Sequence, residues 1–161
     1  MDILEKVDLI ERPPTEEVVT HDELIELFKT NSSPKHYIGL EISGFLHLGS
    51  LLTAGYKIND FVKAGVNCTV FLADWHTLIN DKLGGDWDVI TKVSKYYADA
   101  FKLVCPDAEI VLGSKLYEEK TQYCFDNPEN EHWEGSASFR GIYSAIQTFC
   151  NRKMRLTIYL F

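Results

Sequence analysis

The 161-residue chain lacks several features that would place it in common classes of protein. No apolar run approaches the roughly 18 residues that a membrane-spanning helix needs. The four cysteines show no CxxC pair and no other spacing typical of a metal site, which favours reduced thiols in a cytoplasmic protein. The three spaced glycines of a dinucleotide fingerprint are also absent, and this argues against a dehydrogenase. We find no internal repeat and no low-complexity segment.

Positive charge is scarce over most of the chain. Residues 1–134 contain 12 Lys and Arg against 24 Asp and Glu, whereas residues 135–161 contain four basic residues and no acid. An acidic body argues against non-specific binding to DNA or RNA, which needs many cationic contacts to phosphates. The basic end of the sequence either contacts an anionic partner or forms the solvated face of a helix, and the composition alone leaves both open.

Helical and extended patterns alternate along the chain and predict an α/β fold. Residues 1–12 read as an amphipathic helix and not as a signal peptide. Alternation of strands and helices is typical of a Rossmann-type parallel sheet with helices on both faces. Only three strands are predicted, so the sheet is expected to be incomplete. Predicted helices cover 20–30, 48–65, the stretch between Asp86 and Pro106, and 138–158; predicted strands cover 37–42, 68–73 and 109–112.

The four residues His47, Leu48, Gly49 and Ser50 are the most informative segment. They follow a predicted strand and open a predicted helix, where free backbone N–H groups and the helix dipole favour an anion. A histidine at the phosphate position indicates an enzyme that attacks the α-phosphate of ATP. Ligands of parallel sheets bind beyond the carboxyl ends of the strands. Three further polar residues are predicted at those ends: Glu41, Asp74 and His76.

Three segments, residues 37–50, 71–86 and 111–117, resemble archaeal and eukaryotic-type tyrosyl-tRNA synthetases in order and approximate spacing. The resemblance covers residues 1 to about 120 and fades beyond. It implies an N-terminal helical segment, residues 1–34, followed by the first half of a class I catalytic domain, residues 35–161. It also implies joining of tyrosine to ATP, release of pyrophosphate and transfer of the tyrosyl group to tRNA(Tyr). Mg²⁺ would arrive with ATP, no dedicated metal ligands are expected, and a homodimer is possible.

The resemblance also assigns roles to residues of this sequence. Negative charge builds on the α-phosphate oxygens during attack by the tyrosine carboxylate, so donors aimed at those oxygens supply the catalysis. A pocket that hydrogen-bonds the tyrosine hydroxyl would reject phenylalanine, because the buried polar groups of the pocket would then be left unpaired. Implied catalytic residues are His47 and Ser50; implied ATP-binding residues are Gly44, His47, Gly49 and Ser50; implied tyrosine-binding residues are Tyr37, Gly39, Glu41, Phe71, Asp74 and His76.

Each of these residues also has a purely structural explanation. A histidine at a helix start is often a cap, and aromatic residues in strands are often core residues. The two carboxylates, Glu41 and Asp74, are equally consistent with helix caps or solvated loop acids and with binding of a substrate ammonium group.

The sequence departs from the family pattern in several places. Ser50 stands where a second histidine is common, and Ile42 replaces a frequent proline. The tyrosine-binding helix and the mobile lysine loop of the family's second half are not recognisable, nor is an anticodon-binding domain. Residues 153–157, Lys-Met-Arg-Leu-Thr, imitate the lysine loop only superficially. We therefore expect the chain to carry the N-terminal half and not to complete aminoacylation alone.

Three other functions fit part of the pattern. One is a non-catalytic binding module that retains the nucleotide fold. The second is another nucleotidyltransferase with a His-x-Gly-His signature, which the segment 73–76 disfavours. The third is a tryptophanyl-tRNA synthetase, the nearest sibling, which a preference for tryptophan over tyrosine would reveal.

Overall fold

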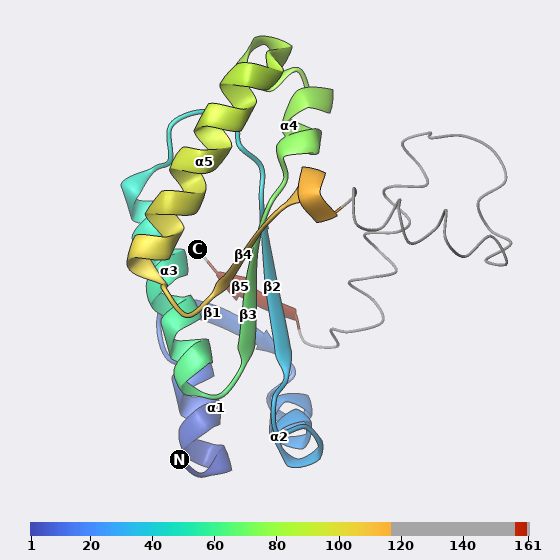
Figure 1. Ribbon diagram of the computed structural model, residues 1–161. Helices are drawn as coiled ribbons and strands as arrows, with labels where there is room; N and C mark the ends of the chain where they lie inside the picture. The colour runs from blue at the N-terminus through green and yellow to red at the C-terminus, as the bar shows by residue number, and fades with distance from the viewer. Residues whose placement is uncertain (117–156, 161) are drawn as a thin grey trace, which may run out of the picture.

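The computed structural model describes residues 1–116 and the backbone of residues 157–160. Figure 1 shows the helices and strands of this part of the chain. In chain order they are α1 (Ile3–Glu11), β1 (Thr15–Val19), α2 (His21–Thr30), β2 (Lys35–Leu40), α3 (Leu48–Lys63), β3 (Asn67–Leu72), α4 (Asp74–Ile79), the 3₁₀ turn η1 (Lys82–Gly85), α5 (Trp87–Val104), β4 (Glu109–Leu112) and β5 (Thr157–Leu160).

The central sheet confirms the predicted parallel α/β architecture. Strands β2, β3 and β4 pair in parallel and in chain order, so that Gly39 lies beside Phe71 and Phe71 beside Val111. Helices α3 and α5 connect the strands, contact each other, and lie on the same side of the sheet (Figure 1). Within the described residues this sheet has three strands, as the sequence predicted.

Alternation along the strands separates two faces of the sheet. Side chains such as Val70 and Leu72 are fully buried against α3 and α5, where they join the core with Phe61 and Phe101. Neighbouring residues in each strand point the other way because successive side chains of a strand alternate between faces. The second face carries Tyr37, Gly39, Thr69, Phe71 and Val111, and it positions the candidate site.

The N-terminal region packs onto the same core. Asp2 and Glu5 form a capping box at the start of α1, and Thr20 accepts a hydrogen bond from the Glu23 N–H at the start of α2. Both helices contribute buried residues to the core cluster: Val7, Ile10, Leu24 and Phe28. The region was expected to be helical, yet it also contains β1, which pairs antiparallel with β5. Local sequence patterns missed this strand because its partner lies far away in the chain.

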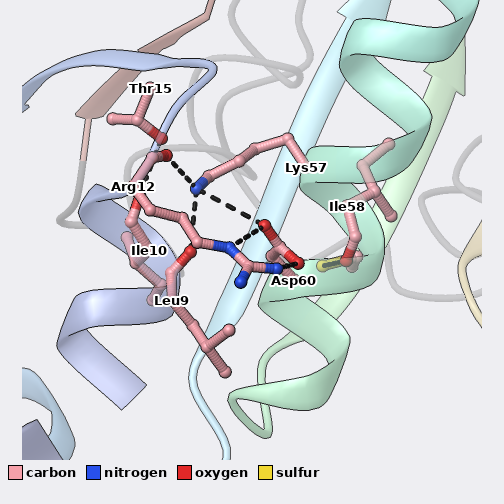
Figure 2. A network of polar contacts seen from close by, with 8 residues as sticks. Leu9, Ile10, Arg12, Thr15, Lys57, Ile58 and Asp60 are labelled. Carbon is pink, nitrogen blue, oxygen red and sulfur yellow. Dashed lines mark hydrogen bonds and ion pairs between the residues drawn. The ribbon is translucent and has the colours of Figure 1, made fainter. Parts of the chain in front are cut away.

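A buried polar network fixes α1 to α3 (Figure 2). The Lys57 ammonium group is fully buried and donates to the backbone carbonyls of Leu9 (2.8 Å) and Arg12 (2.7 Å). Asp60 lies 3.8 Å from the same ammonium and also pairs with the Arg12 guanidinium. Burial lowers the pKa of Lys57 to about 8. The network satisfies carbonyls at the carboxyl end of α1, which have no partner within the helix.

Most predicted boundaries lie within two residues of those observed. Helix α3 ends just before Gly65, whose φ of +87° is the left-handed conformation that suits a glycine after a helix. Asp86, at the predicted start of α5, caps this helix by accepting hydrogen bonds from two backbone N–H groups. Between α4 and α5 lies the turn η1, in which Leu83 also has a positive φ.

The predicted helix at 138–158 is wrong at its last two residues. Thr157 and Ile158 belong to β5, whose backbone pairs with β1. The rest of that helix, and most of the lysine-loop imitation at 153–157, lie outside the described residues.

None of the helices in the described part of the chain combines the length and the apolar composition needed to cross a membrane.

Candidate active site at the carboxyl edge of the sheet

The loop between β2 and α3 presents the start of α3 to solvent. His47 is the N-cap residue of α3, but its side chain makes no capping hydrogen bond. Residues 47–50 are all exposed. The N–H groups of the first turn of a helix have no acceptor within the helix, so they are available to an anion, whose charge the helix dipole also favours. This geometry agrees with a phosphate site.

The two glycines of the predicted nucleotide site differ in their surroundings. A Cβ at Gly49 would lie 3.1 Å from both Cε1 and Nδ1 of His47, so the imidazole ring covers this glycine. A Cβ at Gly44 would meet nothing within 4 Å, and the space beside that backbone is open. Gly49 therefore makes room for the histidine, whereas Gly44 leaves room for a ligand.

Aromatic side chains form a floor on the sheet face opposite α3 and α5. The rings of Tyr37 and Phe71 lie 5.7 Å apart, tilted by 42°. The Tyr37 hydroxyl lies over Gly39, where it is 2.6 Å from the position of a Cβ. Just after β4, a Cβ at Gly113 would lie 3.2 Å from Cζ of Phe71. Three of the predicted tyrosine-binding residues therefore come together on adjacent strands.

The Asp74 carboxylate is occupied by hydrogen bonds from other groups of this chain. Asp74 is 2% exposed, and Oδ1 accepts hydrogen bonds from the backbone N–H groups of Trp75 (2.8 Å) and Ser114 (2.9 Å). Oδ2 accepts a hydrogen bond from the Ser114 hydroxyl. These bonds connect the carboxyl end of β3 to the residues that follow β4. The sequence found the carboxylate but missed Ser114, because the two are 40 residues apart.

The second predicted carboxylate remains at the surface. Glu41 is exposed, and Oε1 accepts a hydrogen bond from the Asn80 side-chain amide. His76 lies half-buried on α4, the short helix that follows β3. Of the two carboxylates predicted at this edge, Glu41 is therefore the one that solvent reaches.

Two residues that hold the β2–α3 loop were also missed. Thr77 accepts a hydrogen bond from the Ile42 backbone N–H, and Tyr97 donates one to the Gly44 carbonyl. Both side chains are buried and lie on helices that pack beneath the loop. Tyr97 fell in a predicted helix, whereas Thr77 lies on α4, a short helix that the sequence analysis did not predict.

A separate cleft of about 440 Å³ opens at the other end of the sheet. It is lined by the first residues of β2, β3 and β4, including Lys35, Asn67 and Glu109. Tyr37 is the one predicted site residue that borders it. Among the described residues, no three His, Cys, Asp or Glu side chains are grouped in a way that would hold a metal ion.

Comparison with known proteins decides the family. The profile of the family described as tRNA synthetases class I (W and Y) matches residues 29–134. The chain belongs to this family. The resemblance carried by the three segments is thereby confirmed. The buried strands, the exposed start of α3 and the aromatic floor are thus parts of a class I synthetase fold.

Individual relatives of this synthetase chain are tyrosine-specific by name. The chain is 50% identical over 126 residues to a tyrosine–tRNA ligase of Thermococcus sibiricus, and the alignment covers 73% of this chain and 34% of the relative. It is 56% identical over 113 residues to that of Pyrococcus horikoshii, covering 70% and 29%. The crystal structure of the Pyrococcus horikoshii tyrosyl-tRNA synthetase complexed with L-tyrosine superposes with a TM-score of 0.65, at 43% identity, over 81% of this chain and 38% of that one. The chain therefore spans about a third of the length of these relatives.

Proposed function

We propose that this chain is the N-terminal part of a tyrosine–tRNA ligase and carries its first tyrosine and ATP contacts. The observation that carries the proposal is the aromatic floor of Tyr37 and Phe71 on β2 and β3, together with the open start of α3, the helix that follows β2 in the chain. In the proposal, a tyrosine that lies on this floor directs its carboxylate toward the start of α3. The tyrosine-specific names of the relatives support the same substrate.

In the proposed reaction, a carboxylate oxygen of tyrosine attacks the α-phosphorus of ATP. The bond from that phosphorus to the bridging oxygen breaks, and pyrophosphate leaves with its electron pair. His47 and the backbone N–H groups of Gly49 and Ser50 donate to the α-phosphate oxygens, whose charge grows as the bond forms. Mg²⁺ enters with the triphosphate as part of the substrate. A terminal ribose hydroxyl of tRNA(Tyr) then attacks the carbonyl carbon of the resulting tyrosyl-adenylate, and AMP leaves as the bond from that carbon to the phosphate oxygen breaks.

Tyrosine recognition is divided among several side chains. Tyr37 and Phe71 provide apolar contact for the phenol ring, and the Tyr37 hydroxyl is the candidate partner for the substrate hydroxyl. Glu41, being exposed, is the better candidate for the substrate ammonium group. We assign Asp74 a positioning role, since its oxygens already accept hydrogen bonds from Ser114. His76 remains a predicted wall of the pocket.

The wider predictions follow from this proposal. Three of them remain predictions. The first is the division into an N-terminal segment of residues 1–34 and a nucleotide-binding domain from residue 35. The other two are a cytoplasmic location and a homodimer. A tryptophan-specific enzyme is disfavoured by the names of the relatives. A non-catalytic binding module remains the second candidate.

The experiment that tests the proposal combines ligand titration with ATP–pyrophosphate exchange. Calorimetry should detect tyrosine binding in preference to phenylalanine and tryptophan, and the His47→Ala variant should lose ATP binding at least tenfold. His21→Ala is the matched control, since His21 lies exposed on α2 and pairs with Glu11.

The outcomes separate the candidates. Exchange that requires tyrosine and disappears with His47→Ala would establish a complete activation site in this chain. Tyrosine and ATP binding without exchange would support the proposed contacts and assign the pyrophosphate step to regions present in the longer relatives. Binding of neither ligand would contradict the proposal and favour the non-catalytic module.

A further inference from the structure

The loop from Glu41 to His47 is attached at its beginning to the helix that follows the next strand. The Ile42 N–H donates to the Thr77 hydroxyl at 3.0 Å, and both residues are fully buried. The Thr77 hydroxyl in turn donates to the Ala73 carbonyl at 3.0 Å, which fixes its orientation. The first residues of the loop are therefore held by α4.

A second attachment comes from α5. The Tyr97 hydroxyl donates to the Gly44 carbonyl at 3.2 Å, across 53 residues of sequence. Tyr97 is 5% exposed, and burial raises its pKa, so the hydroxyl stays protonated and remains a donor. The preceding residue, Tyr96, is 47% exposed and makes no hydrogen bond within the described part of the chain.

Packing alone does not fix this part of the loop. The space beside Gly44 is open, and Phe45 is 98% exposed. Glycine loses more conformational freedom on folding than any other residue, so an ordered glycine needs a specific restraint. Between the buried Ile42 and the half-buried Leu46, the Tyr97 hydroxyl supplies that restraint.

We infer that Tyr97 is a positioning residue for the nucleotide loop, and that its hydroxyl sets the affinity for ATP by holding the Gly44 backbone in its binding conformation. The role rests on the proposed function. It assigns Tyr97 no contact with substrate. A loop ordered before the ligand arrives has less entropy to lose on binding, so the restraint raises affinity.

The test compares Tyr97→Phe with Tyr96→Phe. Each variant removes one hydroxyl and keeps the ring, so the two neighbours form a matched pair. Hydrogen exchange measured by mass spectrometry should be faster in residues 43–47 of Tyr97→Phe and unchanged in Tyr96→Phe. ATP affinity of Tyr97→Phe should fall about three- to tenfold, the effect of one neutral hydrogen bond, while tyrosine affinity stays constant.

Different failures point to different errors. If the wild-type chain binds ATP and Tyr97→Phe binds it equally well, the positioning role is wrong and the proposed function stands. An equal loss of ATP and tyrosine affinity, with a lowered unfolding midpoint, would show that Tyr97 only stabilises the fold, and this too overturns the role. If the wild-type chain binds neither ligand, the proposed function fails and the role fails with it.

Discussion

Three glycines of the candidate site differ in what lies beside their backbone. Gly39 lies under the Tyr37 hydroxyl and Gly49 under the His47 ring, whereas Gly44 has open space beside it. The first two therefore accommodate side chains of the same chain. Only Gly44 fits the simple expectation that a glycine near ATP leaves the backbone accessible.

Gly39→Ala should weaken tyrosine binding at least tenfold without unfolding the protein. The new Cβ would lie 2.6 Å from the Tyr37 hydroxyl, which is the far end of a side chain that can rotate away. The ring would then leave the aromatic floor, while backbone and core stay in place. Calorimetric titration with tyrosine measures the effect, and a thermal melt checks the fold.

Gly44→Ala is the natural companion to this variant. A Cβ there meets nothing within 4 Å, so tyrosine binding and stability should both be retained. Unchanged tyrosine affinity in Gly39→Ala would show that the observed Tyr37 position has no part in recognition.

Residue types were easier to predict than their partners. The sequence analysis predicted roles for His47, Tyr37 and Phe71 because each lies within a continuous segment that resembles the family. Asp74 was found for the same reason, but its partner Ser114 depends on two strand ends meeting in space. Contacts of that kind follow from the packing of the sheet and leave no local pattern.

At the scale of elements, α3 and α5 approach closely at a single glycine. A Cβ at Gly55 would lie 2.3 Å from Cγ1 of Val104. Beside it, the Asn59 side chain donates to the Val104 carbonyl at 2.8 Å, near the end of α5. The glycine therefore sets the separation between the two helices that cover the sheet.

Gly55→Ala should lower the free energy of unfolding by about 1–3 kcal/mol, the usual cost of overpacking a core. The clash is with one branched side chain, so Val104→Ala should recover part of the loss in the double variant. Urea unfolding of the two single variants and the double variant gives the coupling between them. Strict additivity would mean that the helices do not meet as described.

The polar network between α1 and α3 supports a second prediction at this scale. Lys57→Met removes hydrogen bonds from a charged donor to two carbonyls and should cost about 2–4 kcal/mol. Lys63→Met, an exposed position on the same helix, should change stability by about 0.5 kcal/mol or less. Equal melting temperatures for the two variants would contradict a stabilising role for the network.

The longer helices and the central strands were predictable because their signals are local, whereas the six-residue helix α4 was not predicted. Apolar spacing and caps such as Asp86 define where these elements begin and end. The strand β1 has no such signal: it is short, contains two adjacent glutamates and depends on distant β5. Its assignment required knowledge of the pairing.

For the molecule as a whole, His36 makes stability depend on pH. Its Nδ1 is buried and has no hydrogen-bond partner within the described residues, and its ring meets Phe61 edge-on at 4.6 Å. Burial lowers the pKa of His36 from 6.5 to about 4. Between these values the unfolded chain binds a proton that the folded chain does not, so acid favours unfolding.

The stabilising effect of neutral His36 should therefore be complete above pH 6.5 and disappear as the pH falls to about 4. The loss should reach about 3 kcal/mol at most, from 1.36 kcal/mol per pKa unit. Urea unfolding of the wild type and His36→Leu across this range isolates the effect, because all other groups titrate in both. Parallel curves for the two proteins would show that His36 does not titrate differently on folding.

The order of the strands has a consequence for biosynthesis. Because β2, β3 and β4 are neighbours in the sheet in chain order, β3 and β4 each find a neighbouring strand already made when they leave the ribosome. Tyr37, Phe71 and Gly113 emerge in that order, so the aromatic floor assembles from one strand to the next. The strand β1 has no such partner until β5 has been synthesised. Its two glutamates discourage pairing with another chain during that interval, as charges on an edge strand do.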